Sequence, residues 1–190
     1  MRECLRYGGH GLLSSSLGER TPQLRPMRPR DAEILQTYIR GLSLASRHNR
    51  FLGTLNELSP AELRRWCDPN PARQDGLLID ICVDGDQQMI AEARYAIIGD
   101  GSLCEIALSV ADRWQRRGVG TLLLNILGQR AMALGVQTIV ADALRGNAPV
   151  KALARKSGFA ITPDITDARL VRLTKVIGRP LAGDAPAAAA

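Results

Sequence analysis

A short glycine-containing stretch in the middle of the chain has the residue types and spacing to bind an anion. The stretch QRRGVGT, residues 115–121, follows an apolar segment at 103–110 and leads into apolar residues at helical spacing over 118–134. The first N–H groups of a helix have no intrahelical partner, and the helix dipole is positive there. Because glycine has no Cβ, backbone can approach a bulky anion closely. The stretch therefore predicts a phosphate cradle, although a loop that only joins a strand to a helix would also fit. The predicted cradle comprises Gln115, Arg116, Arg117, Gly118, Val119, Gly120 and Thr121.

This stretch matches neither of two common nucleotide-binding loops. It lacks the Gly-Lys-Ser/Thr of a P-loop, and Leu123 stands where a GxGxxG fingerprint has its third glycine.

A second candidate for chemistry is Glu105, in a segment that reads as a strand. Period-two alternation divides the segment into two faces, Leu103, Glu105, Ala107 and Ser109 on one, and Cys104, Ile106, Leu108 and Val110 on the other. A carboxylate among small apolar neighbours beside a cleft would have a raised pKa and could accept a proton. The alternative is an ordinary glutamate on a solvent-facing strand.

The elements that would position these residues predict an α/β fold with a mixed sheet. Strands are expected near 23–27, 76–83, 88–98 and 103–110, with tight turns at 84–87 and 99–102 that make the last three antiparallel. Helices are expected after Asp31, after Ser59, over 118–134 with Gly135 at its end, and from Asn147 to Gly158. Further strands at 136–144, 159–162 and 168–177 give one central βαβ unit in a mostly antiparallel sheet.

Composition limits the class of protein. Residues 1–22 read as a flexible arm and 178–190 as a disordered tail, which leaves one domain at 23–177. No apolar run approaches ~20 residues and no secretory signal is present, so we expect a cytoplasmic protein without a membrane span.

The four cysteines, Cys4, Cys67, Cys82 and Cys104, are too scattered for a zinc site or a disulfide framework. The net charge of +6 suits an anionic cosubstrate better than nucleic acid, because aromatic residues for base stacking are few.

Two blocks of the chain resemble the GCN5-related N-acetyltransferases. "VADRWQRRGVGTLLL" at 110–124 resembles the family's acyl-CoA-binding motif, Gln/Arg-x-x-Gly-x-Gly/Ala, and "ALRGNAPVKALARKSGF" at 143–159 resembles its second block. The resemblance covers about residues 23–175. Within the family, "GLSLASRHNRFLGTLNELSPAELRRW" and "CEIALSVADRWQRRGVG" are similar to bacterial protein lysine acetyltransferases of the Pat type.

The resemblance implies acetyl-CoA as cosubstrate, with its pyrophosphate on the amides of 116–121. It also implies a pantetheine arm along Leu108, Ser109 and Val110, where a β-bulge opens a V between 103–110 and 137–143, and it adds Asn147 as a cofactor-side residue. Glu105 stands at the family's catalytic glutamate, and the N–H of Val110 would polarise the thioester carbonyl. Transfer would be direct, in a ternary complex, with no metal.

One departure from the family leaves a step open. Many members carry a tyrosine where this chain has Ala154, so the proton for the CoA thiolate would come from water or from another residue, such as Ser157. An acyl-enzyme on Cys104 is disfavoured because no histidine lies near it in the sequence. Arg47, His48 and Arg50 are candidates for the wall of the acceptor site.

Two further functions stay open beside acetylation of a protein lysine. One is acetylation of a small amine, and acidic residues near 160–170, of which there are Asp164 and Asp167, would favour a polycation. The other is a non-catalytic acyl-CoA sensor. The sequence leaves open the acceptor, the acyl chain and whether the chain forms a homodimer.

Overall fold

The computed structural model describes residues 22–70, 73–83 and 85–178. One seven-stranded sheet, with strand order β1-β2-β3-β4-β5-β7-β6, organises them. Apart from Pro22 and Gly178, the arm predicted at 1–22 and the tail predicted at 178–190 lie outside the described residues. The strands are β1 (Gln23–Pro26), β2 (Gln74–Val83), β3 (Asp86–Ile98), β4 (Leu103–Val110), β5 (Thr138–Leu144), β6 (Ala160–Pro163) and β7 (Leu170–Val176). The helices are η1 (Pro29–Asp31), α2 (Ala32–Gly41), α3 (Leu44–Phe51), α4 (Pro60–Cys67), η2 (Asp112–Trp114), α5 (Val119–Ala133) and α6 (Ala148–Lys156).

The sheet is mixed and mostly antiparallel, as the sequence predicts. Only β4 and β5 run parallel among the described strands, and α5 connects them as the crossover of the βαβ unit. That pairing covers three residue pairs, from Leu103↔Thr138 to Glu105↔Val140. Strand β5 stays paired with β7 up to Leu144, so β4 and β5 separate beyond Glu105. The predicted V-shaped opening is present.

The predicted cause of that opening is wrong. The register between β3 and β4 runs from Ala91↔Val110 to Ile98↔Leu103 without a shift, so β4 carries no bulge against β3. The sheet irregularity lies instead at Ile79/Asp80, between β2 and β3. The opening arises because β5 follows β7 and leaves β4.

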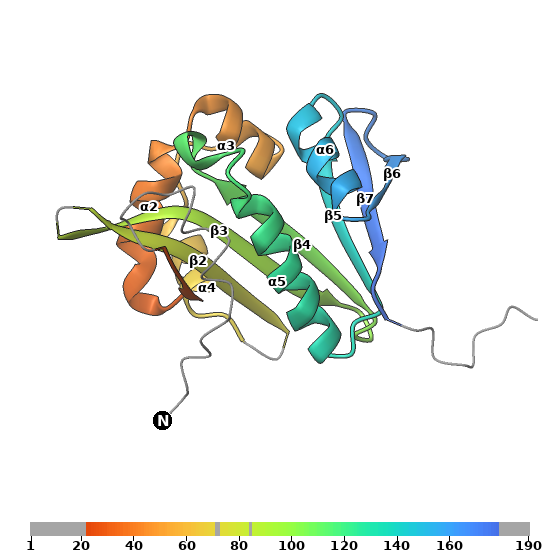
Figure 1. Ribbon diagram of the computed structural model, residues 1–190, viewed down its shortest axis with the longest axis horizontal. Coiled ribbons are helices and arrows are strands. Elements are labelled where there is room, and N and C mark those ends of the chain that lie inside the picture. Colours follow the sequence, from red (N-terminus) through yellow and green to blue (C-terminus); the bar gives the residue numbers. More distant parts are fainter. Residues whose placement is uncertain (1–21, 71–72, 84, 179–190) are drawn as a thin grey trace, which may run out of the picture.

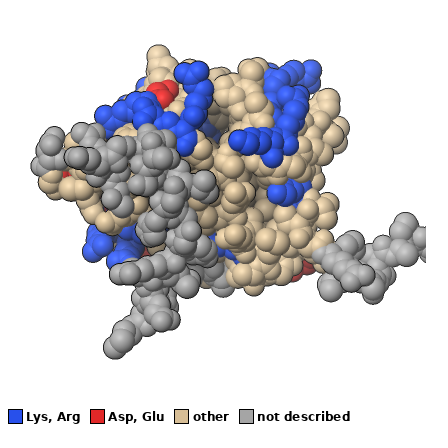
Figure 2. Space-filling view, in the orientation of Figure 1, with Lys and Arg blue, Asp and Glu red and all other residues tan. Residues whose placement is uncertain are grey.

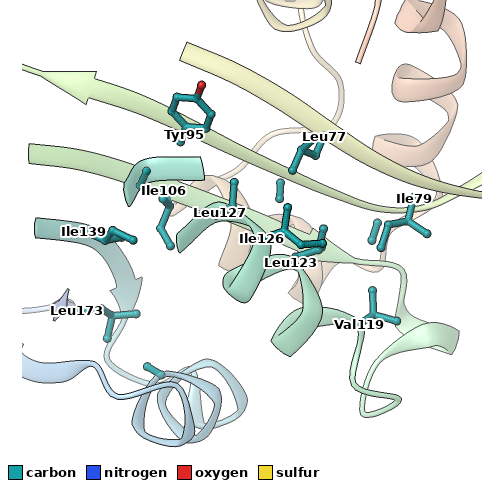
Figure 3. Close-up of a cluster of buried hydrophobic side chains, with 14 of the residues drawn as sticks. Leu77, Ile79, Tyr95, Ile106, Val119, Leu123, Ile126, Leu127, Ile139 and Leu173 are labelled. Atoms are coloured by element: carbon teal, nitrogen blue, oxygen red, sulfur yellow. The ribbon is translucent and has the colours of Figure 1, made fainter. Parts of the chain in front are cut away.

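Helices cover both faces of the sheet, and each face has its own apolar core. In Figure 1, α5 crosses in front of the central strands, and α2 and α4 lie on the far side. Neighbouring residues of β2 point into different cores: Leu77 packs on the α5 side and Leu78 on the α2 and α4 side. Leu123 and Leu127 of α5 are fully buried against Leu77 and its neighbours (Figure 3).

Local capping chemistry explains where several helices begin and end. Ser59 and Glu62 form a capping box at the start of α4, and the Asn147 side chain accepts a hydrogen bond from the N–H of Val150 at the start of α6. Gly135 and Gly158 follow α5 and α6 with φ of 79° each, a conformation that suits glycine. These boundaries match the sequence prediction. No helix in the described ranges is long and apolar enough to cross a bilayer.

Helix α3 is held differently from the others. It has a strong cap, since the Ser43 hydroxyl accepts a hydrogen bond from the N–H of Ser46, but none of its residues is buried. It contacts both β4 and β5, the two strands that separate. Figure 1 shows it at the top of the molecule, in orange.

Candidate functional site

The start of α5 presents free backbone donors. The first hydrogen bond of the helix runs from the N–H of Leu122 to the carbonyl of Gly118, at 3.0 Å. Within the described residues, the N–H groups of Gly118, Val119, Gly120 and Thr121 have no backbone acceptor. These are the donors that a helix leaves unsatisfied, so the predicted anion site is open at its N-terminus.

The two glycines of this loop have different physical roles. Gly118 is the N-cap of α5 and has φ of 84°, in the left-handed region where a side chain is strained. Arg116 has φ of 59°, so the loop also holds a non-glycine residue in this region. Gly120 has an ordinary φ, but a Cβ there would lie 3.1 Å from Cδ2 of Leu153 on α6. Gly118 therefore shapes the loop, while Gly120 permits close packing of α5 on α6.

Gln115 braces the loop. Its Nε2 donates to the carbonyl of Val110 and to the hydroxyl of Ser46 on α3, both at 3.1 Å. Asp112 adds a second tie, because its carboxylate accepts from the N–H and hydroxyl of Ser43 and from the hydroxyl of Ser46. Burial raises the pKa of Asp112, but these hydrogen bonds outweigh it and hold the pKa below its ordinary value. The loop is thus joined to both β4 and α3.

The edge of β4 beside this loop has unpaired peptide groups. The carbonyl of Ser102 accepts from Thr138 on the β5 side, and the N–H of Ala111 donates to Ile90 on the β3 side. Because peptide groups alternate along a strand, those of Leu108 and Val110 face the β5 side, where strand pairing has ended. The Val110 carbonyl accepts from Gln115, which leaves the Val110 N–H without a partner strand. The N–H of Val110 is thus directed into the opening.

Ser109 lies between these two residues and is directed elsewhere. Its peptide groups face β3, and its side chain is buried on the α2 side. Its hydroxyl donates to Oε1 of Glu92 at 2.7 Å and lies 2.9 Å from the Tyr38 hydroxyl. Of the three predicted strand residues, Leu108 and Val110 therefore face the opening and Ser109 does not.

Glu105 is exposed on the face predicted for it. Cys104 and Ile106 are buried in the α5 core, and Glu105 points to the opposite face of the sheet. Its neighbours across the sheet are Ala96 on β3 and Val140 on β5, both small or apolar. The carboxylate therefore stands at the point where β4 and β5 separate.

A second glutamate on this face was missed by sequence reasoning. Glu92 is fully buried in β3 and pairs with Arg50 of α3, with Nε 2.6 Å from Oε1 and Nη2 3.2 Å from Oε2. The only sequence signal was a charged residue within a strand, which is also what a solvent-facing position looks like. Glu92 is engaged with Arg50 and Ser109, so of these two glutamates only Glu105 is exposed.

The remaining candidates lie as follows. The Asn147 side chain caps α6, which opens from the end of β5. Ala154 is buried in the α5 core, and the Ser157 hydroxyl is buried without a partner in the described residues.

His48 is exposed, and Arg47 donates to the carbonyl of Arg40. No group of potential metal ligands is found among the described side chains.

The charge around the opening suits an anionic ligand. Arg116 and Arg117 are exposed beside the N-terminus of α5. The guanidinium carbon of Arg117 lies 5.1 Å from the centre of the Trp114 ring. Figure 2 shows Lys and Arg side chains gathered in two groups along the upper part of this face, where α3 and α6 lie in Figure 1. Free amides, basic side chains and an unpaired strand edge together fit a phosphate-bearing thioester with an extended arm.

Comparison with known proteins agrees with this geometry. Residues 23–160 match the model of the acetyltransferase (GNAT) domain. The chain is 30% identical over 148 residues to Acetyltransferase PA5475 of Pseudomonas aeruginosa, covering 78% of this chain and 80% of that protein. The GNAT domain of S. lividans PAT superposes with a TM-score of 0.74 at 26% identity, over 82% of this chain and 90% of that one. The structure of yncA from Salmonella typhimurium with acetyl-CoA has a TM-score of 0.63 at 18% identity, over 86% of this chain and 98% of that one.

The family model spans the free amides of α5, the open edge of β4 and the cap of α6. The chain therefore belongs to the GNAT acetyltransferase family and is an acetyl-CoA-dependent enzyme.

Proposed function

We propose that the protein transfers an acetyl group from acetyl-CoA to the side-chain amine of a protein lysine, with Glu105 as general base. The observation that carries this proposal is the juxtaposition of the free amides of α5 with the unpaired edge of β4. The Pat-like segments of the sequence support a protein acceptor, and the GNAT domain of S. lividans PAT is 26% identical to this chain.

Acetyl-CoA supplies the acetyl thioester, and the residues of this chain hold and orient it. The N–H groups of 116–121 would bind the pyrophosphate, with Arg116 and Arg117 adding charge. Leu108 would bind the pantetheine arm through its peptide groups, as one more strand binds a sheet edge, and Val110 would present its N–H beside the arm. Asn147 would border the arm where α6 begins.

Glu105 would prepare the amine for attack. A lysine ammonium has a pKa of about 10.4, so at neutral pH a base must remove a proton before the nitrogen can form a bond to carbon. The N–H of Val110 would donate to the thioester oxygen as the N–C bond forms and negative charge develops there, and the C–S bond then breaks as the carbonyl re-forms. Ala154 has no proton to give, so the second proton of the amine, lost as the amide forms, would reach the departing thiolate through water.

A polycationic small amine is the weaker alternative for the acceptor. The two acidic residues in the 160–170 segment are already engaged: Asp164 accepts from Thr166 and from the N–H of Asp167, and Asp167 pairs with Arg169. Both carboxylates therefore already have hydrogen-bond or ion-pair partners within their own loop.

Labelled acetyl-CoA tests the proposal directly. The protein is incubated with radiolabelled acetyl-CoA and a cell lysate, in parallel with a panel of small amines and a lysine peptide. Label on discrete protein bands and on the peptide is the expected result. Label in the small-molecule fraction alone overturns the protein acceptor, and no transfer to any amine, with coenzyme A still bound, indicates a sensor.

A further inference from the structure

The carboxylate of Glu92 is the centre of a network that joins four elements. It is fully buried in β3 and accepts hydrogen bonds from Arg50 of α3 and Ser109 of β4. Ser109 has one hydroxyl proton, which it gives to Glu92, so the Tyr38 hydroxyl of α2 must donate to Ser109 at 2.9 Å. Burial raises the pKa of Tyr38 and keeps it a donor.

The Arg50 side chain packs beside two aromatic rings where it extends to Glu92. Its guanidinium carbon lies 5.2 Å from the centre of the Phe51 ring and 4.9 Å from the Trp66 ring, and its side chain is 9% exposed. A planar guanidinium stacks on such rings and binds a carboxylate with two parallel hydrogen bonds, which a lysine cannot do. The contact is therefore specific for arginine.

Helix α3 depends on this pair for its position. No residue of α3 is fully buried, and its apolar contact with a core is made by Phe51, which is partly buried with its ring centre 6.1 Å from that of Trp66. Polar ties therefore carry much of what holds the rest of the helix. Its N-terminal end is tied through Ser43 and Ser46 to Asp112 and Gln115, and its last turn through Arg50 to Glu92. Since α3 contacts β4 and β5, these polar ties determine what borders the opening on the side of Glu105.

We propose that Arg50 and Glu92 are positioning residues for the acceptor amine: their ion pair fixes α3 beside the opening and so shapes the acceptor side of the site. This inference rests on the proposed acetyl transfer to an amine. The pair does not touch the amides of α5 or the peptide groups of Leu108. The hydrogen bonds of Ser43 and Ser46 to Asp112 and Gln115 do not involve the pair either, so acetyl-CoA binding is retained when it is broken.

The test compares Arg50→Met and Arg50→Lys with the wild-type chain, using the lysine peptide as acceptor. The expected result for Arg50→Met is a rise of about tenfold or more in the KM for the peptide, with little change in the KM for acetyl-CoA, and partial recovery in Arg50→Lys. The matched control is Arg40→Met, which removes the exposed Arg40–Glu57 pair at the end of α2. An unchanged peptide KM in Arg50→Met, or equal rises in both KM values, overturns the inference.

Hydrogen exchange gives a readout that does not depend on activity and covers the case in which Arg50→Met fails to fold. In Arg50→Lys, amide exchange in peptides spanning 44–51 is expected to accelerate, while exchange over 119–133 in α5 stays unchanged. Unaltered exchange in 44–51 contradicts the positioning role. If the wild-type protein binds coenzyme A but acetylates no amine, the proposed function is wrong. The exchange experiment then tests separately whether the Arg50–Glu92 pair holds α3 in place.

Discussion

Glu105 and Val140 form the last residue pair between β4 and β5 before the two strands separate. The candidate base therefore lies at the closed end of the opening into which Leu108 and Val110 direct their peptide groups. A proton acceptor and an N–H donor are thus carried on one strand, on either side of the position where an acyl carbon would react. This arrangement can be tested by changing either group separately.

Replacing Glu105 by Gln is expected to reduce kcat by about 10²–10⁴-fold at pH 7, because the amide cannot accept the proton of the ammonium. Binding of coenzyme A should be unchanged, since Glu105 is not among the anion-binding groups. The rate deficit should narrow as the pH approaches the amine pKa of about 10.4, where free amine is abundant. Initial rates of thiol release across pH, with calorimetry for coenzyme A, measure both effects; a wild-type kcat at pH 7 would remove Glu105 from the mechanism.

Gly118→Ala should weaken coenzyme A binding. At φ of 84°, an L side chain is strained by roughly 1–2 kcal/mol, so the loop would leave the conformation that directs its amides outward. The matched control is Gly128→Ala in the same helix, where an added Cβ meets nothing within 4 Å. That change should stabilise the fold by about 0.4–1 kcal/mol and leave the affinity for coenzyme A unchanged. Equal affinities in the two variants would mean that the αL cap does not matter for binding.

Features set by local chemistry could be predicted from the sequence. The helix starts at Ser59 and Asn147, the helix end at Gly135 and the face of Glu105 all follow from residues within a few positions of one another. The opening between β4 and β5 was expected from family resemblance, but its cause was assigned to a bulge that β4 does not have against β3.

Features that depend on distant residues could not be predicted in this way. Arg50 and Glu92 are 42 residues apart in the sequence, and neither spacing nor periodicity relates them. Helix α3 has no buried residue, so it lacks the apolar repeat by which a helix is normally detected. The alternation that turns Ser109 away from the opening required the actual pairing partners of β4.

Arg25 should be a strong determinant of stability with a defined pH dependence. It donates two hydrogen bonds to Asp31 and one to Asp80, and both carboxylates are buried. Removing it in Arg25→Met leaves two buried charges unpaired, for which we expect a loss of about 3–5 kcal/mol at pH 7. Thermal and urea unfolding measure this, and Arg40→Met, which breaks the exposed pair with Glu57, should change stability little.

The pH dependence follows from the shift at Asp31. Burial raises the pKa of Asp31, but the hydrogen bonds from Arg25 and from the N–H of Arg28 outweigh it, and the folded-state pKa lies below 3.8. A lowered pKa means that the stabilisation is present above the unfolded pKa and is lost as the pH falls through the folded value. The difference between wild type and Arg25→Met should therefore shrink in acid; a difference that is constant from pH 7 to pH 3 would contradict this assignment.

The buried cysteines should be unreactive, which separates direct transfer from an acyl-enzyme mechanism. Burial raises the pKa of Cys104 and of Cys67 to about 11, whereas Cys82 is exposed. Since the thiolate is the nucleophile, iodoacetamide at pH 8 should modify Cys82 in the folded protein and spare Cys67 and Cys104 until urea is added, as peptide mass spectrometry would record. Cys104 also points into the α5 core, on the face opposite Glu105, so it is directed away from an acceptor that Glu105 would deprotonate. Cys104→Ala should accordingly retain acetyl transfer while lowering stability; an inactive but folded Cys104→Ala would favour a covalent route instead.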